Sequence, residues 1–283
     1  MKLIHLLPPT LLLLCCAAGC VSDNDVSPAY VTVTDLQLST PGIADPTEAI
    51  SEVWVFVDNV FEGAFPLPAR IPVLRAGATT MRFEAGIRQN GVSASPDIYE
   101  FYTPFETTVE LVPGETTELG VLGIGYRPEA RFAVFEDFEV NTPRAFTQQV
   151  TGNSALEPTQ EQVLSGSFSG KLTLSRADSL LEVATGNLLS GLTDERLSVW
   201  LEVDFLSDAA LVWGVSGLDG LNVVRSFDAV SVPRNEWTKI YFNLTPAIIS
   251  SGLTEYTLNL SAVLPDDLET GTVYLDNIKL VHF

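Results

Sequence analysis

Short apolar segments, broken by proline or glycine every few positions, are the feature that most limits how this chain can fold. From Tyr30 onward, no run of a dozen residues keeps the period of a helix. Segments such as 51–57 and 197–205 are rich in β-branched and aromatic residues, which favour strands. The chain is therefore predicted to be all-β, with residues 246–250 as the only hint of a helical turn.

The predicted strands fall into two groups, on either side of a short segment at 123–128 that contains glycine and proline. Residues 30–122 hold hairpins, one of them turning at Asp58-Asn59, and fit a small Ig-like β-sandwich. Residues 129–283 offer about ten strands, a density typical of a jelly-roll β-sandwich. We therefore predict an N-terminal Ig-like sandwich, a linker, and a C-terminal jelly roll.

The N-terminal end has the three-part pattern of a secretory signal: a basic start, an apolar stretch and small residues at the exit. The apolar stretch is short and interrupted by Pro8-Pro9, which argues against a transmembrane anchor. The small residues directly before Cys20 resemble the lipobox of bacterial lipoproteins. That resemblance implies removal of residues 1–19 and acylation of Cys20. An ordinary secretory signal that happens to contain cysteine is the alternative.

Cysteine usage agrees with the lipoprotein interpretation. The three cysteines are residues 15, 16 and 20, so cleavage would leave Cys20 alone, which suggests attachment and not a disulfide framework. Acyl chains on it would hold the protein at a membrane. Residues 20–29 would then be the lipidated cysteine and an acidic tether.

The start of this tether carries a second resemblance. Ser22 followed by acidic residues is similar to the export signal of surface lipoproteins in Bacteroidetes, and the whole chain resembles uncharacterised lipoproteins of that group. The resemblance implies an outer-membrane location with exposure at the cell surface. A plain solvated tether is the alternative, because most acidic linkers are only that.

Charge and residue types exclude several functions. The chain has 15 basic and 36 acidic residues, a formal charge of -21, which repels nucleic acids and anionic head groups. After cleavage only His282 remains as a histidine, and no cysteine is free of lipid. The chain therefore has almost none of the residues that Ser–His or Cys–His catalysis needs. No phosphate-binding loop or zinc spacing is present. We predict a non-enzymatic protein; a carboxylate pair serving a glycosidase is the less favoured alternative.

The acidic segment 135–139 and the closing strand 273–278 resemble those of carbohydrate-binding modules with the galactose-binding-like jelly roll. In such modules an acid near the first strand and an Asp on the last strand often hold a structural calcium ion. The resemblance implies that Glu136, Asp137 and Asp276 are calcium ligands, which as hard oxygen donors suit this ion. The alternative is that these acids cap strand ends in solvent.

Alternation along three strands predicts a binding face. Trp200 shares one side of its strand with Glu202 and Asp204, while its apolar neighbours occupy the other side. Aromatic rings beside hydrogen-bonding groups suit a pyranose, which has an apolar face and a polar rim. The predicted ligand-binding residues are Trp200, Glu202, Asp204, Trp237, Lys239, Tyr241 and Asn259.

Besides a glycosidase, one alternative to a glycan-binding lipoprotein remains open. A loop could cover these aromatic residues and make them part of a second core. The protein would then be a structural or protein-interaction lipoprotein of the cell envelope, without a sugar site.

Overall fold

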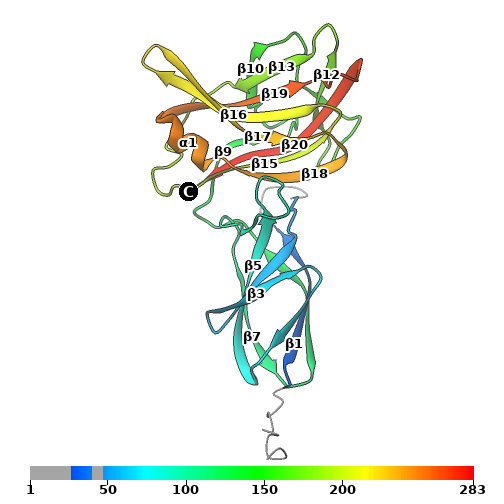
Figure 1. The fold of residues 1–283 in the computed structure, drawn as a ribbon, viewed down its shortest axis with the longest axis vertical. Helices are drawn as coiled ribbons and strands as arrows, with labels where there is room; N and C mark the ends of the chain where they lie inside the picture. Colours follow the sequence, from blue (N-terminus) through cyan, green and yellow to red (C-terminus); the bar gives the residue numbers. More distant parts are fainter. Residues whose placement is uncertain (1–26, 40–46) are drawn as a thin grey trace, which may run out of the picture.

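The computed structural model describes residues 27–39 and 47–283, apart from the Asp228 side chain. These residues form two β-sandwiches stacked end to end, with one short helix (Figure 1). The all-β prediction is confirmed. The predicted signal peptide and Cys20 lie outside the described residues. No helix within the described residues is long and apolar enough to span a bilayer.

The first sandwich consists of a sheet of order β4-β1-β8 and a sheet of order β3-β2-β5-β6, with β7 also paired to β5. Its strands are β1 (Ala29–Leu38), β2 (Glu52–Val57), β3 (Val60–Pro66), β4 (Ala69–Val73), β5 (Gly77–Arg88), β6 (Pro96–Ile98), β7 (Phe105–Leu111) and β8 (Thr116–Ile124). The turn between β2 and β3 has positive φ at Asp58 and Asn59, 48° and 65°. Positive φ at both central residues is what a two-residue type I′ hairpin requires, so the predicted hairpin is confirmed.

The second sandwich also has two sheets, which we name by their distance from the first sandwich. The near sheet has the order β11-β12-β20-β15-β18, with β9 beside β20, and the far sheet has the order β10-β13-β19-β16-β17, with β14 beside β19 (Figure 1). Near-sheet strands are β9 (Arg131–Glu136), β11 (Glu157–Thr159), β12 (Ser169–Ser175), β15 (Val199–Ser207), β18 (Arg234–Asn243) and β20 (Thr270–His282). Far-sheet strands are β10 (Phe146–Thr151), β13 (Leu180–Thr185), β14 (Leu189–Ser190), β16 (Ala210–Asp219), β17 (Asn222–Ser231) and β19 (Glu255–Val263).

Alternation places apolar side chains between the near and far sheets. Leu201 and Phe205 of β15 face Trp213 and Leu260 of the far sheet across a fully buried core. The helix α1 (Thr245–Ser251) closes one edge and coincides with the predicted helical turn. Burial of these side chains, at about 25 cal/mol per Å² of apolar surface, is the main force that holds the sandwich together.

The core of the first sandwich continues into the near sheet. Trp200, Tyr241, Val281 and Phe283 project from the outer face of that sheet and belong to the first sandwich's apolar cluster. The predicted linker is part of this contact, because β8 runs to Ile124 and the following residues bond back to the first sandwich. The two sandwiches therefore share one continuous packed interface.

Candidate functional site

Most of the residues predicted to bind a ligand lie inside the contact between the two sandwiches. Trp200 is 3% exposed, Glu202 is 0% and Tyr241 is 1%, and Asp204 and the Lys239 side chain are equally buried. The strand face was predicted correctly, but the prediction of an exposed sugar-binding surface is wrong for these five residues, because the first sandwich covers that face. Of the predicted set, Trp237 lies half-buried at the edge of the near sheet, and Asn259 lies on the far sheet.

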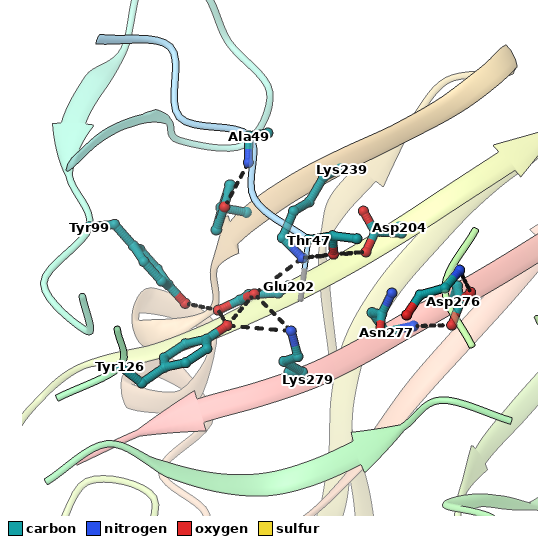
Figure 2. Close-up of polar contacts among 12 residues, drawn as sticks. Thr47, Ala49, Tyr99, Tyr126, Glu202, Asp204, Lys239, Asp276, Asn277 and Lys279 are labelled. Carbon is teal, nitrogen blue, oxygen red and sulfur yellow. Dashed lines mark hydrogen bonds and ion pairs between the residues drawn. The ribbon is translucent and has the colours of Figure 1, made fainter. Parts of the chain in front are cut away.

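The buried residues form a charge network centred on Glu202 (Figure 2). The Nζ atoms of Lys239 and Lys279 lie 3.2 Å and 3.7 Å from Glu202 Oε2. The hydroxyls of Tyr99 and Tyr126 donate to its carboxylate at 2.7 Å and 2.8 Å. Both tyrosines come from the first sandwich or its junction, so this network fixes how the two sandwiches meet.

A second part of the network lies next to Lys239. Its Nζ is 3.4 Å from Asp204 Oδ2, and the Thr47 hydroxyl donates to the same oxygen at 2.5 Å. The Tyr241 hydroxyl accepts a bond from the Ala49 backbone N–H at 3.1 Å. Each charged side chain of this network therefore has a partner, as buried charges require.

Burial and neighbouring charges have opposing effects on the pKa values of the network's ionisable groups. Burial alone would raise the pKa of Glu202, but two ammonium groups and two phenols lower it below its usual value. Burial and the positive charge of Lys239 lower the pKa of Lys279 to about 8. The network therefore joins the two sandwiches, and its carboxylates, Glu202 and Asp204, are buried in the interface.

The three predicted calcium ligands do not converge. Glu136 is buried and its carboxylate is engaged by the Arg144 guanidinium at 3.2 Å, a cation that opposes metal binding there. Asp137 accepts bonds from the Glu139 N–H and the Thr142 hydroxyl, while Asp276 accepts from the backbone N–H groups of Ser165 and Asn277. Within the described residues, no group of three His, Cys, Asp or Glu side chains could hold an ion. These ligands therefore do not fit together, and calcium binding stays a prediction.

Asp276 provides a pH test of this region. Burial raises its pKa to about 7, above the value of about 3.9 expected when unfolded. The folded state then binds more protons than the unfolded state between these values, so stability should fall as pH rises through this window, by at most about 1.4 kcal/mol per pH unit. We expect Asp276→Asn to remove that slope in urea unfolding between pH 4 and 8 in the presence of chelator.

The same experiment with added calcium tests the metal prediction. An ion held by Asp276 would keep the carboxylate ionised, raise the stability of the wild type at pH 7 and leave Asp276→Asn unchanged. An identical slope in both proteins without metal would contradict the buried-acid explanation. Equal stability with and without calcium would contradict the metal site.

A different polar cluster lies on the outer face of the far sheet, away from the first sandwich. It consists of Glu182 on β13, Ser216 on β16, Arg225 and Phe227 on β17, and Thr257 and Asn259 on β19, and we call it the far-sheet cluster. Neighbouring strands place these residues beside one another: Ser216 pairs with Thr257 and Arg225, and Gly214 pairs with Asn259 and Phe227. Alternation turns them all away from the core that Trp213 and Leu260 fill.

The far-sheet cluster is held by hydrogen bonds between its own members. The Ser216 hydroxyl donates to Asn259 Oδ1 at 2.8 Å, and Asn259 Nδ2 lies 3.4 Å from Glu182 Oε1. Arg225 forms an ion pair with Glu182, and its guanidinium lies 5.0 Å from the centre of the Phe227 ring. Glu182 is only 7% exposed, whereas the Arg225 side chain is 42% exposed. The carboxylate is therefore buried, and the guanidinium that pairs with it is accessible from solvent.

A glycine allows this arrangement. A Cβ atom on Gly214 would come within 2.7 Å of Phe227 Cγ and 2.3 Å of the Ser226 carbonyl oxygen. The bare backbone at this position therefore lets Phe227 lie against β16. The result is an aromatic ring next to a cation, a carboxylate and an amide on one open sheet face.

Sequence reasoning found only Asn259 of this cluster. Glu182, Ser216 and Arg225 lie on strands that were predicted, and their alternation with apolar residues could have assigned them to the outer face. The order of the strands in the sheet was the missing information, because it alone places residues from four separate strands together.

Comparisons with known proteins give no family. No protein-family model and no curated protein matches the chain. Among solved structures it is similar to a carbohydrate-binding module of the β-sandwich superfamily, at 14% identity over 84% of this chain and 87% of that one, with a TM-score of 0.39. It is also similar to a mutant family 29 carbohydrate-binding module complexed with cellulohexaose, at 9% identity over 55% of this chain and 92% of that one, with a TM-score of 0.36.

A third similar structure is the family 11 module of a cellulosomal cellulase from Clostridium thermocellum. It is 12% identical over 53% of this chain and 95% of that one, with a TM-score of 0.35. At these identities and TM-scores the similarities identify neither a family nor a ligand for this chain.

Proposed function

We propose that the protein is a non-catalytic glycan-binding lipoprotein whose sugar site is the far-sheet cluster. The observation that carries the proposal is the partly exposed Arg225–Glu182 pair, bonded to Asn259 and next to Phe227. A sugar presents hydroxyls that both donate and accept, so a carboxylate, an amide and a guanidinium together can satisfy them. The aromatic ring supplies an apolar surface for the sugar ring.

A glycan array with the chain lacking residues 1–19 tests the sugar site. We expect Arg225→Ala and Glu182→Gln each to weaken binding about 10- to 100-fold, because hydrogen bonds to charged groups contribute roughly 1.5–3 kcal/mol. Trp237→Ala, on the edge strand β18 of the near sheet, is the control and should bind like the wild type. Binding that survives both far-sheet variants, or no glycan bound at all, would refute the proposal.

The anchor is the second part of the proposal. It is supported by the lipobox-like residues before Cys20 and by the position of Pro28, whose carbonyl oxygen accepts a hydrogen bond from the Gly114 N–H at a turn of the first sandwich. In Figure 1 this turn lies at the end opposite the far sheet, so an anchor there would direct the far-sheet cluster away from the membrane and, in a surface lipoprotein of the outer membrane, outward from the cell.

Metabolic labelling with an alkyne-bearing fatty acid checks the anchor. We expect the wild type to incorporate the label and to sediment with membranes, and Cys20→Ala to do neither, because the acylated thiol is absent. Cys16→Ala is the matched control and should behave like the wild type. Retention of Cys20→Ala in the membrane fraction would contradict lipidation at this residue.

A protein-interaction role has one observation in its favour. The tip of the β16–β17 hairpin exposes Leu218, Leu221 and Val223, which are 67%, 101% and 66% exposed. Three neighbouring apolar side chains in solvent favour contact with another protein. A partner in the cell envelope that binds this tip is compatible with glycan binding on the sheet face beside it.

A further inference from the structure

The two sandwiches enclose a cleft on one side of their interface, separate from the far-sheet cluster. It has a volume of about 520 Å³ and is lined by residues of both sandwiches, among them Ser51 and Arg88 from the first and Ser231, Arg234 and Ile240 from the second. This volume is within the usual range for small-molecule sites, which often form between domains. Its walls contain apolar side chains of β15, β17 and β18 as well as polar groups.

The cleft is preformed by backbone contacts between the sandwiches. The Asn90 N–H donates to the Tyr241 carbonyl at 2.8 Å, and the Asn90 side-chain oxygen accepts from the Asn243 N–H at 3.0 Å. Gly91 follows with a φ of 68°, and a Cβ there would lie 2.8 Å from Ile240 Cδ1. The rim of the cleft is therefore held in place without a ligand.

The charge of the lining is opposite to that of the whole chain. Three cationic residues, Arg88, Arg234 and Lys239, line the cleft, and none of its described lining residues is Asp or Glu, although the chain carries a formal charge of -21. Arg88 is paired with Glu52 at 3.0 Å, and Lys239 is paired within the interface. Arg234 makes no ion pair with any described residue, so its guanidinium is free to bind an anion.

Two hydroxyl groups in the cleft are buried and unsatisfied. The Oγ atoms of Ser51 and Ser231 have no hydrogen-bond partner among the described residues, and Ser231 is only 2% exposed. A buried hydroxyl without a partner costs about 1–3 kcal/mol, so such groups in native proteins usually have one. Both serines line the cleft, and a ligand bound there would lie beside them.

We propose that this cleft binds a small hydroxylated carboxylate with the size and chemistry of a hexuronate. The carboxylate would pair with Arg234, and ring hydroxyls would bond to Ser231 and Ser51. The ring itself would lie against the apolar walls that Val232 and Ile240 contribute. Arg is suited to this role because its planar guanidinium binds a carboxylate through two parallel hydrogen bonds.

Calorimetric titration of the chain lacking residues 1–19 with glucuronate, galacturonate and glucose tests the proposal. We expect at least one uronate to bind with a stoichiometry of one and glucose to bind at least 10-fold more weakly. Arg234→Gln should weaken uronate binding at least 10-fold. Arg75→Gln, an exposed arginine outside both the cleft and the far-sheet cluster, should leave it unchanged.

Ser231→Ala provides a second measurement that does not depend on charge. It should weaken uronate binding severalfold while leaving the protein as stable as the wild type or more so, because the removed hydroxyl has no partner. Absence of saturable binding by both uronates, equal affinity for glucose, or binding that Arg234→Gln leaves intact would each overturn the proposal. Because Arg234 lies in the cleft and not in the far-sheet cluster, Arg234→Gln tests this site separately from the proposed glycan site.

Discussion

Replacing Glu202 with alanine is expected to lower the free energy of unfolding by about 3–5 kcal/mol, because it leaves buried Lys279 without its main counter-charge and Lys239 with Asp204 alone. The Nζ atoms of Lys239 and Lys279 both lie within 3.7 Å of the Glu202 carboxylate, and both side chains are almost completely buried. Two tyrosine hydroxyls also lose their acceptor. Urea unfolding monitored by tryptophan fluorescence measures this change.

A matched surface pair gives the control for this prediction. Glu195 is bonded to Arg131 at 2.9 Å, but both side chains are more than half exposed, so Glu195→Ala should cost less than about 1 kcal/mol. Adding Lys279→Met to Glu202→Ala should recover part of the lost stability, because it removes one of the unpaired charges. A Glu202→Ala protein as stable as Glu195→Ala would show that the interface tolerates uncompensated lysines.

The second large effect is expected at Trp200. Its indole is 3% exposed and packs edge-on against Tyr99 of the first sandwich, with ring centroids 5.6 Å apart. Trp200→Ala removes the largest near-sheet side chain from the interface and should cost about 3–5 kcal/mol. Trp237→Ala is the matched control, because this half-buried indole lies at the sheet edge and should contribute less than about 1 kcal/mol.

The Trp200 variant also separates the corrected interpretation from the sequence-based one. If Trp200 only joins the sandwiches, the folded variant should bind glycans with wild-type affinity while melting at a lower temperature. Selective loss of glycan binding at unchanged stability would restore the original assignment of this residue to a sugar site.

Alternation predicted the faces of individual strands well, since it depends only on local backbone geometry. Leu201 and Phe205 point into the core and Trp200 and Glu202 point out of it, as the pattern indicates. Whether another part of the protein covers the outward face of a strand depends on contacts with residues that are distant in the sequence. A tryptophan between two acids suits a sugar-binding surface as well as an interface with a second sandwich.

A signal for the interface was nevertheless present in the sequence. Residues 99–102 read Tyr-Glu-Phe-Tyr between β6 and β7 of the first sandwich, and the sequence closes on His282-Phe283. Phe101 stacks on Phe283 with ring centroids 4.5 Å apart, and Tyr99 contacts Tyr241 at 4.8 Å. Three aromatic residues within four positions of one loop indicate that the loop packs against another part of the chain. The partner of each ring, however, could only be assigned from the structure.

The parallel pairing of β1 with β8 determines how the first sandwich responds to tension. The chain enters the sandwich at the start of β1 and leaves toward the second sandwich at the end of β8, and these two points lie at opposite ends of the same strand pair. A pull between residue 28 and the second sandwich therefore loads the hydrogen bonds from Tyr30 to Leu38 together, in shear. Antiparallel strands pulled from one end would instead release their bonds one at a time, so this sandwich is arranged to carry force along its length.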